Sequence, residues 1–149
     1  MRAVVQRVQE ARVEVDGRTV GAIGRGVLIL LGIEHPDGEE DADYLASKII
    51  HLRIFEDSDH KFNLSLADIR GEALVVSQFT LLADCRKGRR PSFDAAAAPE
   101  QARRLYEYFI RVIENASIAA ASGKFQASMK VHLVNDGPVT VLLDSKKLF

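Results

Sequence analysis

The sequence has few of the features that mark secreted, membrane-bound or strongly basic proteins. Its one cysteine, Cys85, cannot form an internal disulfide, which favours a reducing compartment. Lys and Arg number 20 against 21 Asp and Glu, so a generally basic protein that binds nucleic acid without specificity is disfavoured. The longest apolar run, residues 27–33, falls far short of the roughly 20 residues that span a bilayer. These absences predict a cytoplasmic protein that does not insert into membranes.

The composition that is present is typical of a globular protein. Hydrophobic residues make up 47% of the chain and charged residues 28%, which excludes wholesale disorder. A length of 149 residues suits one domain with a core of its own. We therefore expect a single domain over residues 1–149, without repeats or linkers.

The first third of the chain has the pattern of β structure. Val13 and Val15 alternate with charged residues, which predicts a strand with one face in water. Asp16-Gly17 then predicts a tight hairpin turn, because glycine accepts a positive φ without steric cost. The apolar run that begins at Gly26 predicts a central strand buried on both faces. Further strands are expected at residues 52–55, at 73–79, from Phe125 onward to 134, and at 139–143.

Two helices are expected. Apolar residues recur at helical spacing between Ala42 and Ile50, and the acidic residues at 37 and 39–41 suit the positive end of the helix dipole. A second helix should begin near Pro99, which is well placed in a first turn. Its apolar stripe is Leu105, Phe109, Val112 and Ile113, with Ala116 and Ile118 towards its end. The residues thus predict a mixed domain with two helices and most of its mass in sheet.

Familiar catalytic machinery is missing from the sequence. The four histidines show no metal-ligand spacing, no glycine-rich phosphate loop is present, and there is no Gly-x-Ser-x-Gly nucleophile motif. Arg86 and Lys87 beside Cys85 would favour its thiolate, but no companion motif supports a catalytic cysteine. We therefore predict a site without a metal or a cofactor.

Three segments stand apart from this scaffold. Ser77-Gln78-Phe79-Thr80 places polar groups at the end of a buried strand, a common place for ligand contacts, although such residues also satisfy local backbone groups. Gly137-Pro138 joins a residue that permits close approach to one that fixes φ, although residues 135–138 also suit a hairpin turn between the last two strands. Arg86, Lys87, Arg89 and Arg90 suit a phosphate backbone or, equally, a solvated loop.

Taken together, these segments resemble the D-aminoacyl-tRNA deacylase family over nearly the whole chain. The resemblance rests on Ser77-Gln78-Phe79-Thr80, on Gly137-Pro138-Val139-Thr140 and on the linking segment from Lys87 to Phe93, and it begins at Met1-Arg2-Ala3-Val4-Val5. It implies an α/β fold, a compact three-layer β/β/α domain with mainly antiparallel sheets and two main helices. It also implies hydrolysis of the ester between a D-amino acid, or glycine mischarged on tRNA-Ala, and the 3′-terminal adenosine of tRNA.

The resemblance also assigns residues to the site. Ser77, Gln78, Phe79 and Thr80 would line the pocket, where main-chain N–H groups and the 2′-hydroxyl of the tRNA would supply the catalysis. Gly137-Pro138 would form a cis peptide that enters the active site of the other subunit of a homodimer and excludes L side chains. Residues shaping the pocket wall would be Phe125 and Met129, although a core role suits them equally, and Arg86, Lys87, Arg89 and Arg90 would contact tRNA.

Two positions depart from this resemblance, and other functions remain open. Many relatives have glycine where this chain has Gln126, and often also where it has His60. The first departure should affect the pocket rim or the adenosine contact, and the second little. The alternatives are a relaxed deacylase that edits a mischarged L-aminoacyl-tRNA, a non-catalytic tRNA-binding module, and a purely structural oligomer.

Overall fold

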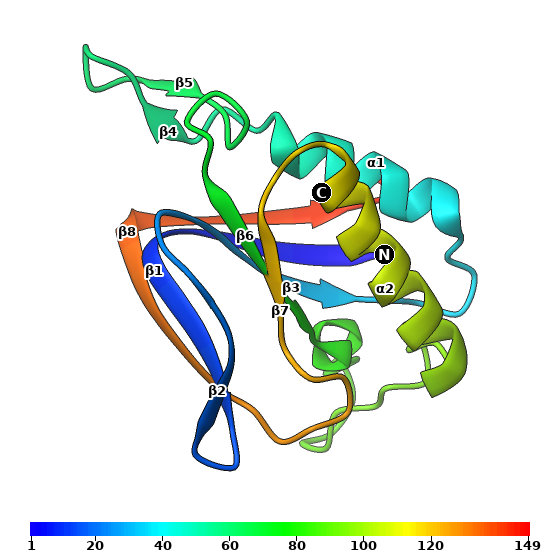
Figure 1. The fold of residues 1–149 in the computed structure, drawn as a ribbon. Helices are drawn as coiled ribbons and strands as arrows, with labels where there is room; N and C mark the ends of the chain where they lie inside the picture. Colours follow the sequence, from blue (N-terminus) through cyan, green and yellow to red (C-terminus); the bar gives the residue numbers. More distant parts are fainter.

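The computed structural model describes all residues from 1 to 149, and its regular elements are mainly one six-stranded sheet and two helices (Figure 1). The strand order is β2-β1-β3-β6-β7, and β8 pairs with the other edge of β1. The pairs that β1 makes with β2, β3 and β8 are antiparallel, whereas β3–β6 and β6–β7 are parallel. The strands of this sheet are β1 (Arg2–Val15), β2 (Arg18–Ile23), β3 (Gly26–Gly32), β6 (Glu72–Ser77), β7 (Ala120–Ser122) and β8 (Lys130–Asp144).

The remaining elements cover or extend this sheet. Helices α1 (Glu39–Ile50) and α2 (Pro99–Asn115) lie on the same side of it (Figure 1). A small hairpin of β4 (Phe55–Glu56) and β5 (Phe62–Leu64) projects from one end. A short 3₁₀ helix, η1 (Phe79–Leu82), follows β6 directly. None of the helices is both long enough and apolar enough to cross a membrane.

Successive side chains of the central strands point to opposite faces of the sheet, and this alternation produces two hydrophobic cores. Val27 and Ile29 of β3 face α1 and α2, in a large cluster of buried side chains. Leu28 of β3 and Leu74 of β6 point the other way, into a smaller cluster with the second half of β1, β2 and the first half of β8. The result is the β/β/α arrangement with mainly antiparallel pairing that the resemblance implied, and that prediction is confirmed.

The two sheet layers approach closely where β2 passes β7. A side chain at Gly21 could not fit there, because its Cβ would lie 2.4 Å from the backbone oxygen of Ser122. The hairpin predicted at Asp16-Gly17 is also present, and both residues have positive φ, 50° and 76°. This combination suits a two-residue turn that follows the natural twist of the strands.

The hairpin turn that residues 135–138 would also suit is not present, because these residues lie inside one long strand, β8. It runs antiparallel to β1 from Lys130 opposite Glu14 to Asp144 opposite Arg2, and register shifts occur only around its middle. The two halves of β8 therefore pair with the same neighbour rather than with each other. Residues 135–138 form an irregularity inside one long strand, because β1 supplies hydrogen bonds on both sides of it. The Gly137-Pro138 peptide within this irregularity is cis.

Both predicted helices are present, with small differences at their ends. Pro99 occupies the first turn of α2, and Leu105, Phe109 and Ile113 are buried as expected. The helix ends at Asn115, so the predicted extension of its stripe to Ile118 is wrong.

Some predicted strands are also shorter than expected. The strand expected at 52–55 is limited to Phe55 and Glu56, β6 ends at Ser77 rather than at residue 79, and residues 125–129 are irregular. The short strand β7 was not predicted, because its alanines show no periodic pattern.

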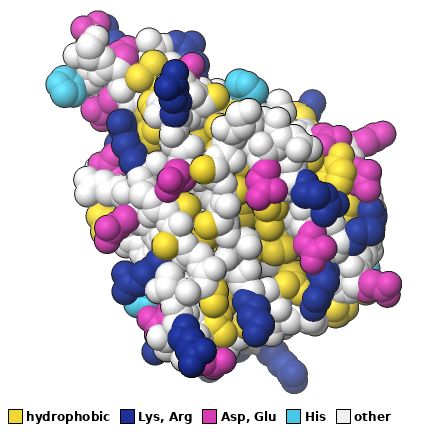
Figure 2. Space-filling model, in the orientation of Figure 1, with side chains coloured by type: hydrophobic (Ala, Val, Ile, Leu, Met, Phe, Trp, Pro, Cys, Tyr) yellow, Lys and Arg dark blue, Asp and Glu magenta, His cyan; other side chains and the backbone are white.

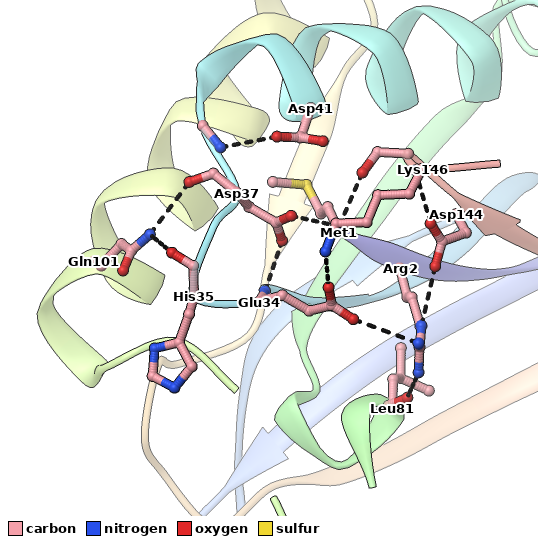
Figure 3. A network of polar contacts seen from close by, with 12 residues as sticks. Met1, Arg2, Glu34, His35, Asp37, Asp41, Leu81, Gln101, Asp144 and Lys146 are labelled. Carbon is pink, nitrogen blue, oxygen red and sulfur yellow. Dashed lines mark hydrogen bonds and ion pairs between the residues drawn. The ribbon is translucent and has the colours of Figure 1, made fainter. Parts of the chain in front are cut away.

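Around the start of α1, the acidic residues have different roles. Asp41 accepts a hydrogen bond from the N–H of Gly38 at 2.9 Å, which caps the helix. Asp37 precedes the N-cap residue Gly38, as expected, but its carboxylate makes no capping hydrogen bond to the helix. Its buried carboxylate pairs instead with the α-amino group of Met1 at 2.7 Å and accepts the N–H of Glu34 at 2.6 Å (Figure 3).

Candidate active site

The segment Ser77-Gln78-Phe79-Thr80 leaves the sheet at the end of β6 and turns at once into η1. The N–H of Gln78 donates to the carbonyl of Leu31 at 2.8 Å, which holds this segment against the end of β3. The guanidinium of Arg2 donates to the carbonyl of Leu81 at 3.2 Å and also pairs with Asp144 (Figure 3). The position of η1 is therefore fixed from both sides by β1, β3 and the end of β8.

A cavity of about 590 Å³ opens beside this segment. Thr80 does not line it. This side chain is exposed, and its Oγ1 accepts a hydrogen bond from Nε2 of Gln78. Five of the residues that the resemblance assigns to the site do line the cavity: Ser77, Gln78, Phe79, Phe125 and Met129.

One wall of the cavity is made of small residues that carry no chemical signal in the sequence. Ala96 and Ala97 lie along the end of β3, and the N–H of Ala97 donates to the carbonyl of Ile33 at 2.9 Å. Pro99 and Ala102, from the start of α2, continue this wall. These residues were not predicted to belong to the site, and the only signal that marks them is the run of four alanines just before Pro99.

The opposite wall comes from the segment between β7 and β8. Phe125 packs against the ring of Tyr106 with centroids 5.8 Å apart, and burial raises the pKa of Tyr106 to about 12. Met129 approaches the backbone closely, since a Cβ at Gly123 would lie 2.7 Å from its Sδ. Gln126 lines the cavity with a φ of +62°, in the left-handed region that favours glycine. Gln126 was expected to lie at the pocket, and it does line the cavity.

None of the residues that line the cavity is ionisable. Its fifteen lining residues are apolar except for the side chains of Ser77, Gln78 and Gln126. The cavity of this chain therefore offers no side-chain general base. Its chemical resources are hydrogen-bonding side chains, main-chain groups at the end of β6, and an apolar surface that suits a planar ring or a hydrocarbon.

Gly137 and Pro138 lie in the irregularity of β8 and do not line the cavity of their own chain. Both are exposed, and Gly137 has a φ of +141°. The buried guanidinium of Arg7 holds this region by donating to the carbonyls of Asp136 and Ile54, each at 2.8 Å. Within one chain the structure thus separates the two signature motifs.

Comparison with known proteins identifies the family. The family model described as D-Tyr-tRNA(Tyr) deacylase matches residues 4–144. The chain belongs to this family. The D-aminoacyl-tRNA deacylase of Geobacter sulfurreducens is 62% identical over 98% of this chain and 96% of its own length. That of Thermosipho africanus is 59% identical over the full length of both. The predicted membership of the deacylase family is confirmed, and the chain is accordingly an enzyme, a hydrolase.

Two solved structures are similar to this deacylase family member. The c-Myc DNA Unwinding Element Binding Protein shares 42% identity and a TM-score of 0.91, covering 97% of this chain and 98% of that protein. A probable eukaryotic D-amino acid tRNA deacylase has a TM-score of 0.82 at 20% identity, covering 95% and 97%. The second similarity shows that the fold is shared.

The basic segment, residues 86–90, precedes a residue that contacts the lining of the deacylase cavity. The ring of Phe93, just after this segment, meets the ring of Phe79 edge-on at 5.1 Å. All four cations, Arg86, Lys87, Arg89 and Arg90, are exposed. Arg86 donates to both carboxylate oxygens of Asp84, at 2.9 and 2.6 Å, and these bonds hold the pKa of Asp84 well below its usual value. Three cations of the segment are therefore free of that pairing.

Proposed function

We propose that the chain hydrolyses the ester of D-aminoacyl-tRNA, and of glycyl-tRNA mischarged on tRNA-Ala, to free amino acid and tRNA. This reaction would remove wrongly attached residues before translation uses them. The observation that carries the proposal is the cavity at Ser77-Gln78-Phe79, which has the apolar walls and polar strand end of a nucleoside site but no ionisable side chain. The proposed reaction uses no metal or cofactor.

Main-chain donors and the substrate itself would supply the catalysis. The first N–H groups of a helix have no acceptor within it, so those of Phe79 and Thr80 at the start of η1 are the candidates for an oxyanion hole. Loss of one such donor typically costs about 3–4 kcal/mol of transition-state stabilisation. Water would attack the ester carbonyl, the bond to the ribose 3′ oxygen would break, and the neighbouring 2′-hydroxyl would relay the proton.

A rigid backbone wedge from a second copy would supply the chiral selection. Gly137 and Pro138 are exposed, lie outside the cavity of their own chain, and are held by Arg7. Placed at the chiral centre of the substrate, their backbone would exclude one hand by steric overlap, whichever side chain the amino acid carries. The proposed active unit is therefore a homodimer in which each site uses both chains.

The basic segment would bind tRNA. Lys87, Arg89 and Arg90 are exposed beside the rim at Phe93, where the acceptor strand would leave the cavity. Dense positive charge suits the phosphate backbone, and such contacts weaken as salt rises.

The decisive experiment compares one tRNA charged separately with D-tyrosine and L-tyrosine, with glycyl-tRNA-Ala as a third substrate. We expect rapid loss of the D and glycyl esters, while the L ester decays at its rate without protein. Loss of both tyrosyl esters would contradict chiral selection and favour relaxed editing. Binding of all three tRNAs without cleavage would favour a binding module.

Mixed variants test the shared site. Gly137→Ala should impair D-tyrosyl-tRNA cleavage because the added Cβ, 2.7 Å from Cγ2 of Val139, would displace the wedge into the space of the substrate. Phe79→Ala should impair it because part of the pocket lining is lost. When the two are refolded together, a mixed dimer would contain one intact site, so about a quarter of the wild-type activity should return. No recovery on mixing would show that each site is complete within one chain.

A further inference from the structure

Arg103 is an exposed residue that contacts two residues of the cavity lining. Its guanidinium carbon lies 5.1 Å from the centre of the Phe125 ring, and its Nη2 donates to Oε1 of Gln126 at 3.3 Å. Phe125 and Gln126 both line the cavity, as does Ala102, the preceding residue on α2. The guanidinium is therefore fixed against the lining of the cavity.

No carboxylate neutralises Arg103, although some other exposed arginines are paired. Arg104 pairs with Glu39 at 2.8 Å, and Arg86 pairs with Asp84, but Arg103 forms no ion pair. A guanidinium has five N–H donors, and Gln126 accepts from only one of its nitrogens. The remaining donors of this exposed side chain are free to receive an anion.

Gln126 contributes to this arrangement at a conformational cost. Its φ of +62° is one that side chains rarely adopt, and glycine would occupy it without strain. A glutamine at this position instead gives Arg103 an acceptor that orients its guanidinium. The departure from glycine thus has a role in placing a positive charge at the rim.

We propose that Arg103 binds the 5′-phosphate of the terminal adenosine, the group that joins it to the rest of the tRNA. The inference rests on the proposed function, which places that nucleoside and its amino acid in the cavity. The chain of the tRNA must then leave through the mouth by way of this phosphate. A guanidinium fork matches two phosphate oxygens in one plane, which would orient the ribose as well as attract it.

The basic segment suits phosphates further along the strand. It meets the rim through the contact of Phe93 with Phe79, and Arg86 is already paired with Asp84. Arg103, in contrast, directly touches two residues of the cavity lining. The two groups of cations would therefore contact successive parts of the same acceptor end.

Two small esters test this assignment without the rest of the tRNA. They are 2′(3′)-O-D-tyrosyl-adenosine and the same ester carrying a 5′-monophosphate. We expect the wild-type chain to cleave the phosphorylated ester with kcat/KM roughly tenfold higher, mainly through KM, as one charge-assisted contact would give. In Arg103→Gln the ratio of the two kcat/KM values should fall to about one, and Arg103→Lys should keep part of it, because charge remains without the fork.

Arg111→Gln is the matched control. It removes another exposed arginine of α2, stacked at 5.8 Å on the ring of Tyr108 and away from the cavity, and should keep the wild-type ratio. Gln126→Gly should lower the ratio partly, because Arg103 loses its acceptor. A ratio that Arg103→Gln leaves unchanged, or that Arg111→Gln lowers equally, would overturn the assignment. If the wild-type chain cleaves both esters equally, only this inference fails; if it cleaves neither ester nor D-tyrosyl-tRNA, the proposed function fails.

Discussion

Thr80 carries the hydroxyl that a covalent mechanism would require. Its Oγ1 accepts a hydrogen bond from Gln78, and the side chain lies outside the cavity lining, which contains no group able to remove its proton. We predict that Thr80→Ala lowers the single-turnover rate on D-tyrosyl-tRNA by less than about tenfold, whereas loss of a true nucleophile costs on the order of 10⁶. A complete loss of activity in a variant with wild-type thermal stability would instead identify Thr80 as the nucleophile.

Backbone conformation explains why glycine suits the two positions at which this chain departs from the resemblance, His60 and Gln126. His60 and Gln126 have φ values of 59° and 62°, so both occupy conformations that glycine adopts most easily. The residue types in the sequence do not by themselves reveal these φ angles. The resemblance therefore identified these two positions from the sequence, but the reason that glycine suits them is known only from their φ values in the structure. For Gln126 that meaning includes its bond to Arg103, which no local pattern predicts because 23 residues separate them.

At the scale of elements, Tyr106 fastens α2 to the sheet. Its hydroxyl donates to the carbonyl of Val75 in β6 at 2.7 Å, and the side chain is 3% exposed. Tyr106→Phe should lower the free energy of unfolding by about 1 kcal/mol at neutral pH, because one buried hydrogen bond is lost. The carbonyl of Val75 still accepts the N–H of Gly123 at 3.0 Å, which limits the loss.

The same tyrosine predicts a dependence on alkaline pH. Burial raises the pKa of Tyr106 to about 12, above the usual value of about 10 for a tyrosine. Between these values the unfolded chain releases the proton and the folded chain keeps it. Stability should therefore fall as pH rises through this range, by at most about 1.4 kcal/mol per pH unit from this group. Urea unfolding from pH 9 to 11.5 should show a shallower fall for Tyr106→Phe than for wild type, while the exposed Tyr44→Phe should retain the wild-type profile. Parallel profiles for all three would contradict this prediction.

Local signals located some elements, and long-range pairing determined the others. The Asp16-Gly17 turn, the buried β3 and the Pro99 start of α2 follow from residue types and spacing within a few positions. The continuity of β8 does not, because β1 supplies its partners from the other end of the chain. Likewise, β7 is defined by its parallel pairing with β6 and not by its alanines.

At the scale of the whole molecule, charges of both signs are interspersed on the face shown in Figure 2, and one ion pair is fully enclosed. The α-amino group of Met1 and the carboxylate of Asp37 are both 0% exposed, and Ser145 adds a hydroxyl acceptor at 2.9 Å. This pair joins the first strand, the start of α1 and the end of β8.

Removing Asp37 should therefore be costly. In Asp37→Ala the buried ammonium loses its counterion and the N–H of Glu34 loses its acceptor, so unfolding should become easier by about 3–5 kcal/mol. Glu39→Ala breaks the exposed pair with Arg104 and should change stability by less than about 1 kcal/mol. Chemical denaturation of the two variants provides the comparison, and similar small losses in both would contradict the importance of the enclosed pair.

Only part of the cavity lining was predictable from the sequence, and the assembly of the candidate site was not. The motif residues Ser77, Gln78 and Phe79 meet Phe125 and Met129 around one cavity, as the resemblance implied. The alanine wall could not be inferred, because a side chain that only leaves space gives no chemical signal. The separation of Gly137-Pro138 from that cavity also required the path of β8.

The pairing of the first strand with the last has a consequence for the order in which the protein forms. Residues up to 142 positions apart are hydrogen-bonding neighbours in the β1–β8 ladder, and contacts so distant in sequence make folding slow. During synthesis, the edge of β1 that pairs with β8 stays uncovered until almost the entire chain has been made. Until then, a strand of 14 residues, half of them apolar, has an unpaired edge of the kind that invites aggregation. A protein that acts on the substrates of translation would thus complete its own fold only when its translation is nearly finished.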